Sequence, residues 1–177
     1  MDRAKELFLK YNGNRFYMDR EGDGAEYDRY FVTKEMEEMW TDECICGFLE
    51  SKPQGKAAVR DYSSVTELLE RDVQDDRWNR CLYYPLRAEH LDDATVLYML
   101  QASYRMAERA VKKHRFSKEE CSIYIDELDE YIRAVRHRAE NGTVTRSEDY
   151  TMQEFSDPVY IEGYLEDLVH KWNQLLH

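Results

Sequence analysis

The chain has 177 residues and a formal net charge of −12, with 42% hydrophobic and 13% aromatic residues. This length suits one domain, or one domain with a small appendage, and it is sufficient to bury a core. The acidic balance disfavours binding to nucleic acid phosphates, and no stretch reaches the roughly 18 apolar residues of a membrane span, so we expect a cytoplasmic protein with no membrane or nucleic acid partner.

The first 32 residues predict a short helix followed by two strands. Apolar residues three and four apart, from Ala4 to Tyr11, indicate an amphipathic helix that ends at the turn-forming sequence 12–14. Residues 15–18 and 27–32 have the composition of short strands, and an acidic loop containing glycine joins them. We therefore predict a small β-hairpin that leans on the helices, because an isolated two-stranded hairpin is only marginally stable.

A helix over residues 33–49 is predicted next, with Thr33 as its N-cap. Its apolar face consists of four residues spaced four apart: Met36, Trp40, Cys44 and Phe48. The stretch 51–56 contains proline and glycine and interrupts the pattern. We therefore predict an N-terminal unit at 1–52, packed on a helical bundle at 57–177 within one compact domain.

Two shorter helices are predicted before residue 90. Ser64 and Glu67 have the spacing of a capping box ahead of an apolar run, which indicates that a helix begins there. A second helix is predicted around Trp78, and we expect it to end near Tyr84 because Pro85 disfavours a helical conformation in the residue before it.

Three long apolar stripes in the second half of the chain give the strongest structural prediction. They cover residues 97–111, 121–139 and 161–175, and their apolar residues alternate at steps of three and four. This spacing places one apolar stripe along each of three α-helices, and each stripe must be buried against another part of the protein.

The residues between these stripes predict where the helices begin. Asp92 is a suitable N-cap, Ser117 and Glu120 form a capping box, and Pro158 suits the first turn of the last helix. A connection this short between helices 92–115 and 117–141 predicts an antiparallel αα-hairpin. The predicted fold class is therefore mainly α: a helical bundle built on that hairpin, with a small N-terminal β-hairpin.

Two places suggest a metal site, and both lack the ligands that one requires. The loop from Asp19 to Gly24 has the acids and glycine of a calcium loop, but Tyr30 occupies the position that needs a bidentate glutamate. We interpret the loop as an exposed turn and leave cation binding open. Cys44 and Cys46 have no matching pair of ligands, so we expect reduced thiols, no metal and no cofactor.

The charged residues and the motif search give no catalytic site. The acidic clusters, Asp92 and Asp93 among them, fall outside the apolar stripes, which predicts solvated faces. Basic residues end helices 92–115 and 117–141, where they complement the helix dipoles at opposite poles of the hairpin. The chain has no Glu-x-x-His pair of a di-iron bundle, no Gly-x-Ser-x-Gly turn and no glycine-rich phosphate loop.

The 14 tyrosines are the feature that favours a function, because Tyr and Trp are enriched at interaction hot spots. The leading hypothesis is a non-catalytic protein-interaction module with an acidic, tyrosine-rich surface that suits a basic protein partner. The residues proposed for that surface are Tyr27, Tyr30, Tyr83, Tyr84, Tyr160 and Tyr164.

Two alternatives remain open. One is a small-molecule-binding or hydrolytic enzyme with a site in a bundle crevice near Trp40, Trp78 or His90. The other is a homodimer, because the striped segments can present more apolar area than one chain covers.

Overall fold

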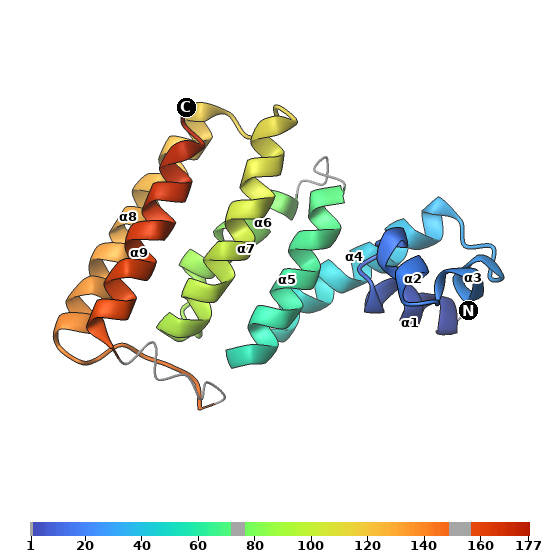
Figure 1. The fold of residues 1–177 in the computed structure, drawn as a ribbon, viewed down its shortest axis with the longest axis horizontal. Helices are drawn as coiled ribbons and strands as arrows, with labels where there is room; N and C mark the ends of the chain where they lie inside the picture. The colour runs from blue at the N-terminus through green and yellow to red at the C-terminus, as the bar shows by residue number, and fades with distance from the viewer. Residues whose placement is uncertain (1, 72–76, 149–156) are drawn as a thin grey trace. The chain divides into compact units, whose positions relative to one another are not determined.

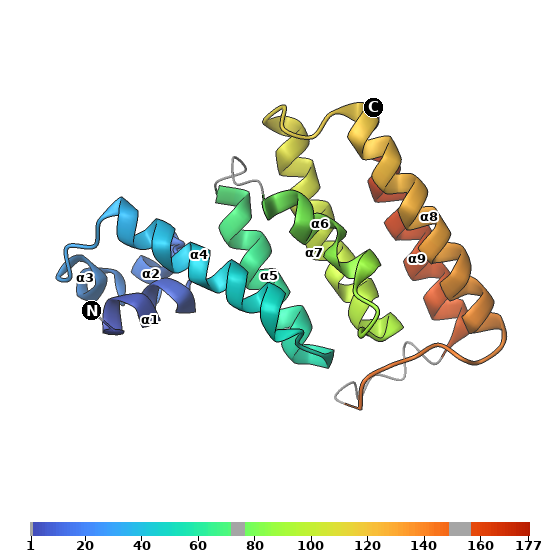
Figure 2. The ribbon, with the colours of Figure 1, turned by 180° about the vertical axis from the view of Figure 1, so that it is seen from behind.

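A computed structural model describes residues 2–71, 77–148 and 157–177, and the chain divides into two compact units, Met1–Ser51 (unit 1) and Lys52–His177 (unit 2). The helices of unit 1 are α1 (Asp2–Lys10), α2 (Arg15–Arg20), α3 (Gly24–Asp28) and α4 (Lys34–Ser51). The helices of unit 2 are α5 (Gly55–Arg71), α6 (Arg77–Arg87), α7 (Asp93–Lys112), α8 (Lys118–Glu140) and α9 (Pro158–Gln174) (Figures 1 and 2). The predicted mainly helical class is confirmed. No described helix is long and apolar enough to cross a membrane.

The predicted β-hairpin at residues 15–18 and 27–32 is wrong, because the described residues contain no strand and this region forms α2 and α3. Asn14 begins α2: its side-chain oxygen accepts a hydrogen bond from the N–H of Tyr17 at 3.4 Å. Met18 is the buried residue of this helix. A run of four residues is too short to distinguish the apolar period of a strand, two residues, from that of a helix, 3.6 residues. The N-cap therefore decides that this segment is helical.

Unit 1 is held by a small core in which α1 packs against α3 and α4. The rings of Phe8 and Trp40 lie 5.5 Å apart, and Ile45 of α4 is fully buried. Thr33 caps α4 as predicted, because its hydroxyl accepts a hydrogen bond from the N–H of Met36 at 3.4 Å. Because Ile45 is buried and was not part of the predicted stripe, the buried face of α4 differs slightly from the predicted one.

In unit 2, α5 begins at Gly55, so Ser64 and Glu67, predicted as the capping box of a later helix, lie within it. The segment 55–63 contains adjacent alanines and no proline, so nothing in it prevents the helix from beginning before the predicted capping box. Helix α5 packs extensively on α7, which is the most buried helix of the unit, and α7 also contacts α6 and α9.

Helices α7 and α8 run antiparallel through a short connection, as Figure 1 shows, and the predicted capping box at Ser117 and Glu120 is present. Each helix nevertheless packs most closely on another one, α7 on α5 and α8 on α9. Aromatic rings fill the space between them: Trp172 of α9 stacks on Tyr124 of α8 at 4.3 Å and meets Tyr104 of α7 edge-on at 5.8 Å. These three rings form one layer across the bundle.

Helix α6 does not end near Tyr84 as predicted, because it continues through Pro85 to Arg87. Proline has no N–H, so the carbonyl of Cys81, four residues earlier, loses its helical donor. The hydroxyl of Tyr62, from α5, donates a hydrogen bond to this carbonyl at 2.8 Å. The tertiary structure thus supplies the donor that the helix lacks, and this allows α6 to accommodate a proline.

Two further side chains complete this buried hydrogen-bond network. The hydroxyls of Ser103, on α7, and Tyr62 lie 2.7 Å apart, and Ser103 also donates to the carbonyl of Met99, in its own helix, at 3.2 Å. Tyr124 of α8 donates to the next carbonyl of α6, that of Leu82, at 3.3 Å. Helix α6 is therefore hydrogen-bonded by side chains from two neighbouring helices.

Burial predicts how the stability of the fold depends on alkaline pH. Burial raises the pKa of Tyr62 well above its ordinary value, so the folded protein retains this phenolic proton at a pH where the unfolded chain loses it. The unfolded value is about 10, so this contribution is fully present below about pH 10 and is lost above it. Between about pH 9 and pH 11 the free energy of unfolding should fall by about 1.4 kcal/mol more in the wild type than in Tyr62→Phe.

Urea unfolding curves at a series of pH values measure this difference, with each protein referred to its own stability at the lowest pH of the series. Equal pH dependence of the wild type and Tyr62→Phe would contradict the burial of this hydroxyl in the folded state.

Candidate functional site

The acids of the loop from Asp19 to Gly24 are neutralised within unit 1. Asp23 accepts hydrogen bonds from the Lys10 ammonium at 2.8 Å and the Tyr11 hydroxyl at 2.6 Å, and these two bonds lower the pKa of its carboxyl. Asp19 forms an ion pair with Arg15 at 3.2 Å. Helices flank the loop, where strands were predicted. Among the residues that the structure describes, no group of three or more His, Cys, Asp or Glu side chains could hold a metal ion.

The tyrosines of unit 1 proposed for an interaction surface differ in exposure. Tyr27 is buried, and its hydroxyl donates to Glu37 at 2.8 Å. Tyr30 is exposed and its hydroxyl donates to Glu26 at 3.3 Å. Only Tyr30 of this pair therefore presents its ring to solvent.

The tyrosines of unit 2 proposed for that surface lie on two helices, α6 and α9. The ring of Tyr83 meets Tyr124 edge-on at 5.0 Å, and the Tyr84 hydroxyl lies 3.3 Å from Nε2 of His90. Tyr164 donates to the carbonyl of Leu97 at 2.8 Å. Tyr160, whose ring lies 6.5 Å from that of Tyr164, is the most exposed of these four. Three of the four tyrosines are thus partly engaged in packing unit 2.

The three residues proposed for a crevice have separate surroundings. Trp40 belongs to unit 1 and packs on Phe8, whereas Trp78 and His90 belong to unit 2. Trp78 meets the ring of Phe116 edge-on at 5.3 Å, and His90 lies beside Tyr84. An enzyme site at these positions stays a prediction.

Asp93 is the charged residue whose position contradicts the sequence analysis, because only 5% of it is exposed. Arg138 of α8 donates two hydrogen bonds to its carboxylate, at 2.6 and 3.0 Å. The Tyr131 hydroxyl donates a third at 3.1 Å, and burial together with this carboxylate raises the pKa of Tyr131. The prediction that Asp93 lies on a solvated face is therefore wrong.

Thr145 completes this cluster and attaches the segment 141–148 to the start of α7. Its N–H and hydroxyl donate to Asp93 at 2.9 and 3.1 Å, and its hydroxyl accepts from the Asp93 N–H at 2.9 Å. Its carbonyl accepts from the N–H of Ala94 at 3.2 Å. The carboxylate thus has five donor contacts, all within the chain. A cleft of about 350 Å³ adjoins the cluster. Because the contacts of the carboxylate all lie within the chain, we interpret the cluster as structural and call it the latch.

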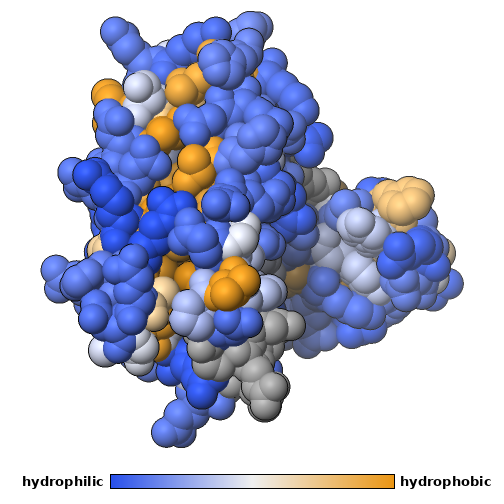
Figure 3. Space-filling view, turned by 60° about the vertical axis from the view of Figure 1, so that its left-hand side comes forward, coloured by the Kyte–Doolittle hydropathy of each residue, from blue (hydrophilic) through white to orange (hydrophobic). Residues whose placement is uncertain are grey.

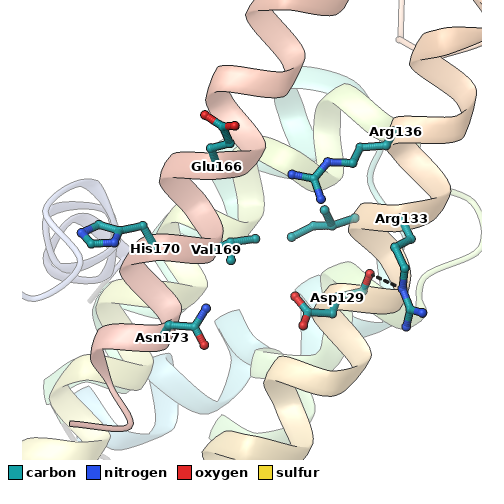
Figure 4. Close-up of a pocket in the computed structure, with 8 residues that line it drawn as sticks. Asp129, Arg133, Arg136, Glu166, Val169, His170 and Asn173 are labelled. Atoms are coloured by element: carbon teal, nitrogen blue, oxygen red, sulfur yellow. Dashed lines mark hydrogen bonds between the residues drawn. The ribbon is translucent and has the colours of Figure 1, made fainter.

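A polar groove of about 740 Å³ runs between α8 and α9 (Figure 4). Its floor includes Ile132 and Val169, and Figure 3 shows apolar side chains as an interrupted strip between polar ridges on the face turned to the viewer. In Figure 4 the Arg136 side chain extends across the groove, while Arg133 and His170 point away from it. Because the charged groups do not converge on one point, this groove offers no evident catalytic centre.

Unit 1 carries four exposed aromatic side chains, two in α2 and two directly after α3, and we call them together the aromatic end: Phe16, Tyr17, Tyr30 and Phe31. An ion pair between Arg15 and Asp28, 2.6 Å long, joins the start of α2 to the end of α3. Phe16 and Tyr17 follow Arg15 directly, and Tyr30 and Phe31 follow Asp28 within three residues. The ion pair therefore joins the two segments that carry these aromatic residues.

Phe31 is the most exposed of these side chains, at 88%, and Phe16 is 70% exposed. The backbone of Phe31 has φ +48°, in the left-handed region that bulky residues rarely adopt. Holding a residue there costs on the order of 1 kcal/mol or more, and such strain is concentrated at functional sites. Phe16 and Phe31 were predicted to lie in strands, and Asn14, as an N-cap, could have indicated the helix that contains Phe16.

Comparison of the chain with models of protein families, with curated proteins and with solved structures found no match.

The latch predicts a large stability difference between two ion pairs made by α8. Asp93→Ala leaves the half-buried Arg138 without its carboxylate and should lower the free energy of unfolding by about 3 kcal/mol. Glu162→Ala removes an exposed pair with Arg136 and should cost less than about 1 kcal/mol. Urea unfolding of both variants measures the difference, and equal losses would show that the Asp93 cluster does not hold the fold.

Proposed function

We propose that this chain is a non-catalytic protein-interaction module, and that the aromatic end of unit 1 is the surface that binds its partner. The observation that carries the proposal is the exposure of Phe16 and Phe31, two large rings with no polar group of their own. Exposed aromatic side chains of this kind are what partners bury at the centre of an interface.

The charge of unit 1 defines the class of partner. Residues 1–51 contain 13 acidic and 7 basic side chains, and Glu35, Glu38 and Asp42 lie exposed on α4. Met39, in the same stretch of α4, is 50% exposed. Apolar side chains among acids favour a segment that is both apolar and basic, because the charges steer the encounter and the rings are buried on contact. We therefore assign the partner as a protein segment that forms a basic amphipathic helix.

Titration calorimetry with a defined peptide tests the proposal. A Lys/Leu amphipathic helix of about 18 residues should bind the wild type with a Kd on the order of 10 µM, and a Glu/Leu helix of the same pattern should not bind. The double variant Phe16→Ser, Phe31→Ser should weaken binding of the basic helix at least about tenfold, because the apolar contact is lost while the acids remain. The control Ile123→Ser removes an exposed apolar side chain of α8 in unit 2 and should leave the affinity unchanged.

The double variant distinguishes binding through the exposed aromatic side chains from attraction between opposite charges alone. If the double variant binds the basic helix as tightly as the wild type, charge alone accounts for binding and the proposal is wrong. Sedimentation of the free protein tests the homodimer alternative: a dimer that the Phe16/Phe31 variant abolishes would show that a second copy of the chain occupies the aromatic end.

A further inference from the structure

A second crevice, separate from the aromatic end, lies between α7 and α9 in unit 2 and has a volume of about 340 Å³. Helix α7 contributes Gln101, Tyr104 and Arg105, and helix α9 contributes Tyr164, Leu168 and Lys171. The two helices run in the same direction, as Figure 1 shows, so residues early in one lie beside residues early in the other. Volumes of this size are found among the smaller ligand pockets of proteins.

The walls of this crevice are aromatic and partly dry. Tyr104 and Tyr164 are half-buried, and Leu168, which also lines the crevice, is buried. Tyr164 is fixed by its hydrogen bond to the Leu97 carbonyl at 2.8 Å, and burial raises the pKa of its hydroxyl. The ring of Tyr104 meets that of Trp172 edge-on, with their centroids 5.8 Å apart. Both rings are therefore held in place before any ligand binds, which reduces the conformational entropy lost on binding.

One end of the crevice is positively charged although the chain as a whole is acidic. Arg105 and Lys171 line it together with one carboxylate, Asp167, which pairs with Lys171 at 2.5 Å. The charges of Glu108, Lys112 and Lys171 all act on Tyr104, and Lys112 pairs with Glu108 at 3.0 Å, so Arg105 supplies the net positive charge at this end. At the opposite end the lining groups are Gln101 and Tyr164, which carry no charge. The crevice thus combines an apolar body with a cationic end.

From this combination we infer that the α7–α9 crevice binds a small planar aromatic carboxylate. The ring system would lie between Tyr104 and Tyr164 over Leu168, and the carboxylate would accept hydrogen bonds from Arg105 and Lys171. This inference does not rest on the proposed function, because the aromatic end belongs to unit 1 and the crevice to unit 2. The two can therefore fail separately.

The test uses 2-naphthoate as the probe and 2-naphthamide, its uncharged analogue, as the comparison. Titration calorimetry on the full chain should show saturable binding of 2-naphthoate at least about fivefold tighter than that of 2-naphthamide, because the amide forfeits the charge-assisted hydrogen bonds. The variant Arg105→Met, Lys171→Met should abolish this difference and leave the affinity for 2-naphthamide unchanged. Intermolecular nuclear Overhauser effects should connect the probe to the ring protons of Tyr104 and Tyr164.

The matched control is Lys118→Met, Arg133→Met, which removes the same charge from exposed positions on α8 and should preserve the preference for 2-naphthoate. All four substituted side chains are at least partly exposed, and circular dichroism verifies that both variants fold. The inference is overturned if 2-naphthoate does not bind, if the two probes bind equally, or if the control loses the preference as well.

Discussion

The structure of unit 2 depends on how α6 accommodates a proline. Pro85 removes the donor for the Cys81 carbonyl, and a buried carbonyl without a partner costs about 1–3 kcal/mol. Tyr62 donates to that carbonyl at 2.8 Å and Tyr124 to the next one at 3.3 Å. These two hydroxyls therefore hydrogen-bond α5 and α8 to α6, which also packs on α7. Tyrosine suits this role because its hydroxyl lies far from the backbone at the end of a rigid apolar ring.

Because tyrosines hold the helices together in this way, fewer of them are available to bind a partner. Of the tyrosines predicted to form an interaction surface, Tyr27 is buried, Tyr83 packs on Tyr124, and Tyr164 donates to the carbonyl of Leu97. Two other features leave side chains accessible: the exposed phenylalanines of the aromatic end in unit 1, and the α7–α9 crevice, which Arg105 and Lys171 line. The two proposals follow from what the packing of each unit leaves available.

The parts of the fold that the sequence predicted are those specified by local pattern. Long stripes indicated α7, α8 and α9, the caps at Asp92 and Ser117 hold the hydrogen bonds expected of them, and Pro158 lies in the first turn of α9 as predicted. Two of the failures occurred where a distant residue decided the outcome. Nothing near Pro85 announces that Tyr62 will supply its missing donor, and Asp93 is buried because Arg138, 45 residues away, reaches it. The exposure of Phe31 also depends on tertiary structure, which no spacing rule encodes.

A double-mutant cycle between Tyr62→Phe and Pro85→Ala tests the central claim most directly. Alanine at position 85 restores an N–H that can donate to the Cys81 carbonyl, whereas the contact between Tyr62 and Ser103 is the same in both backgrounds. We predict that Tyr62→Phe lowers the free energy of unfolding by about 1–2 kcal/mol in the wild type, and by about 1 kcal/mol less in the Pro85→Ala background. Additive losses would contradict the account, because they would mean that the Tyr62 hydroxyl does not replace the donor that proline removes.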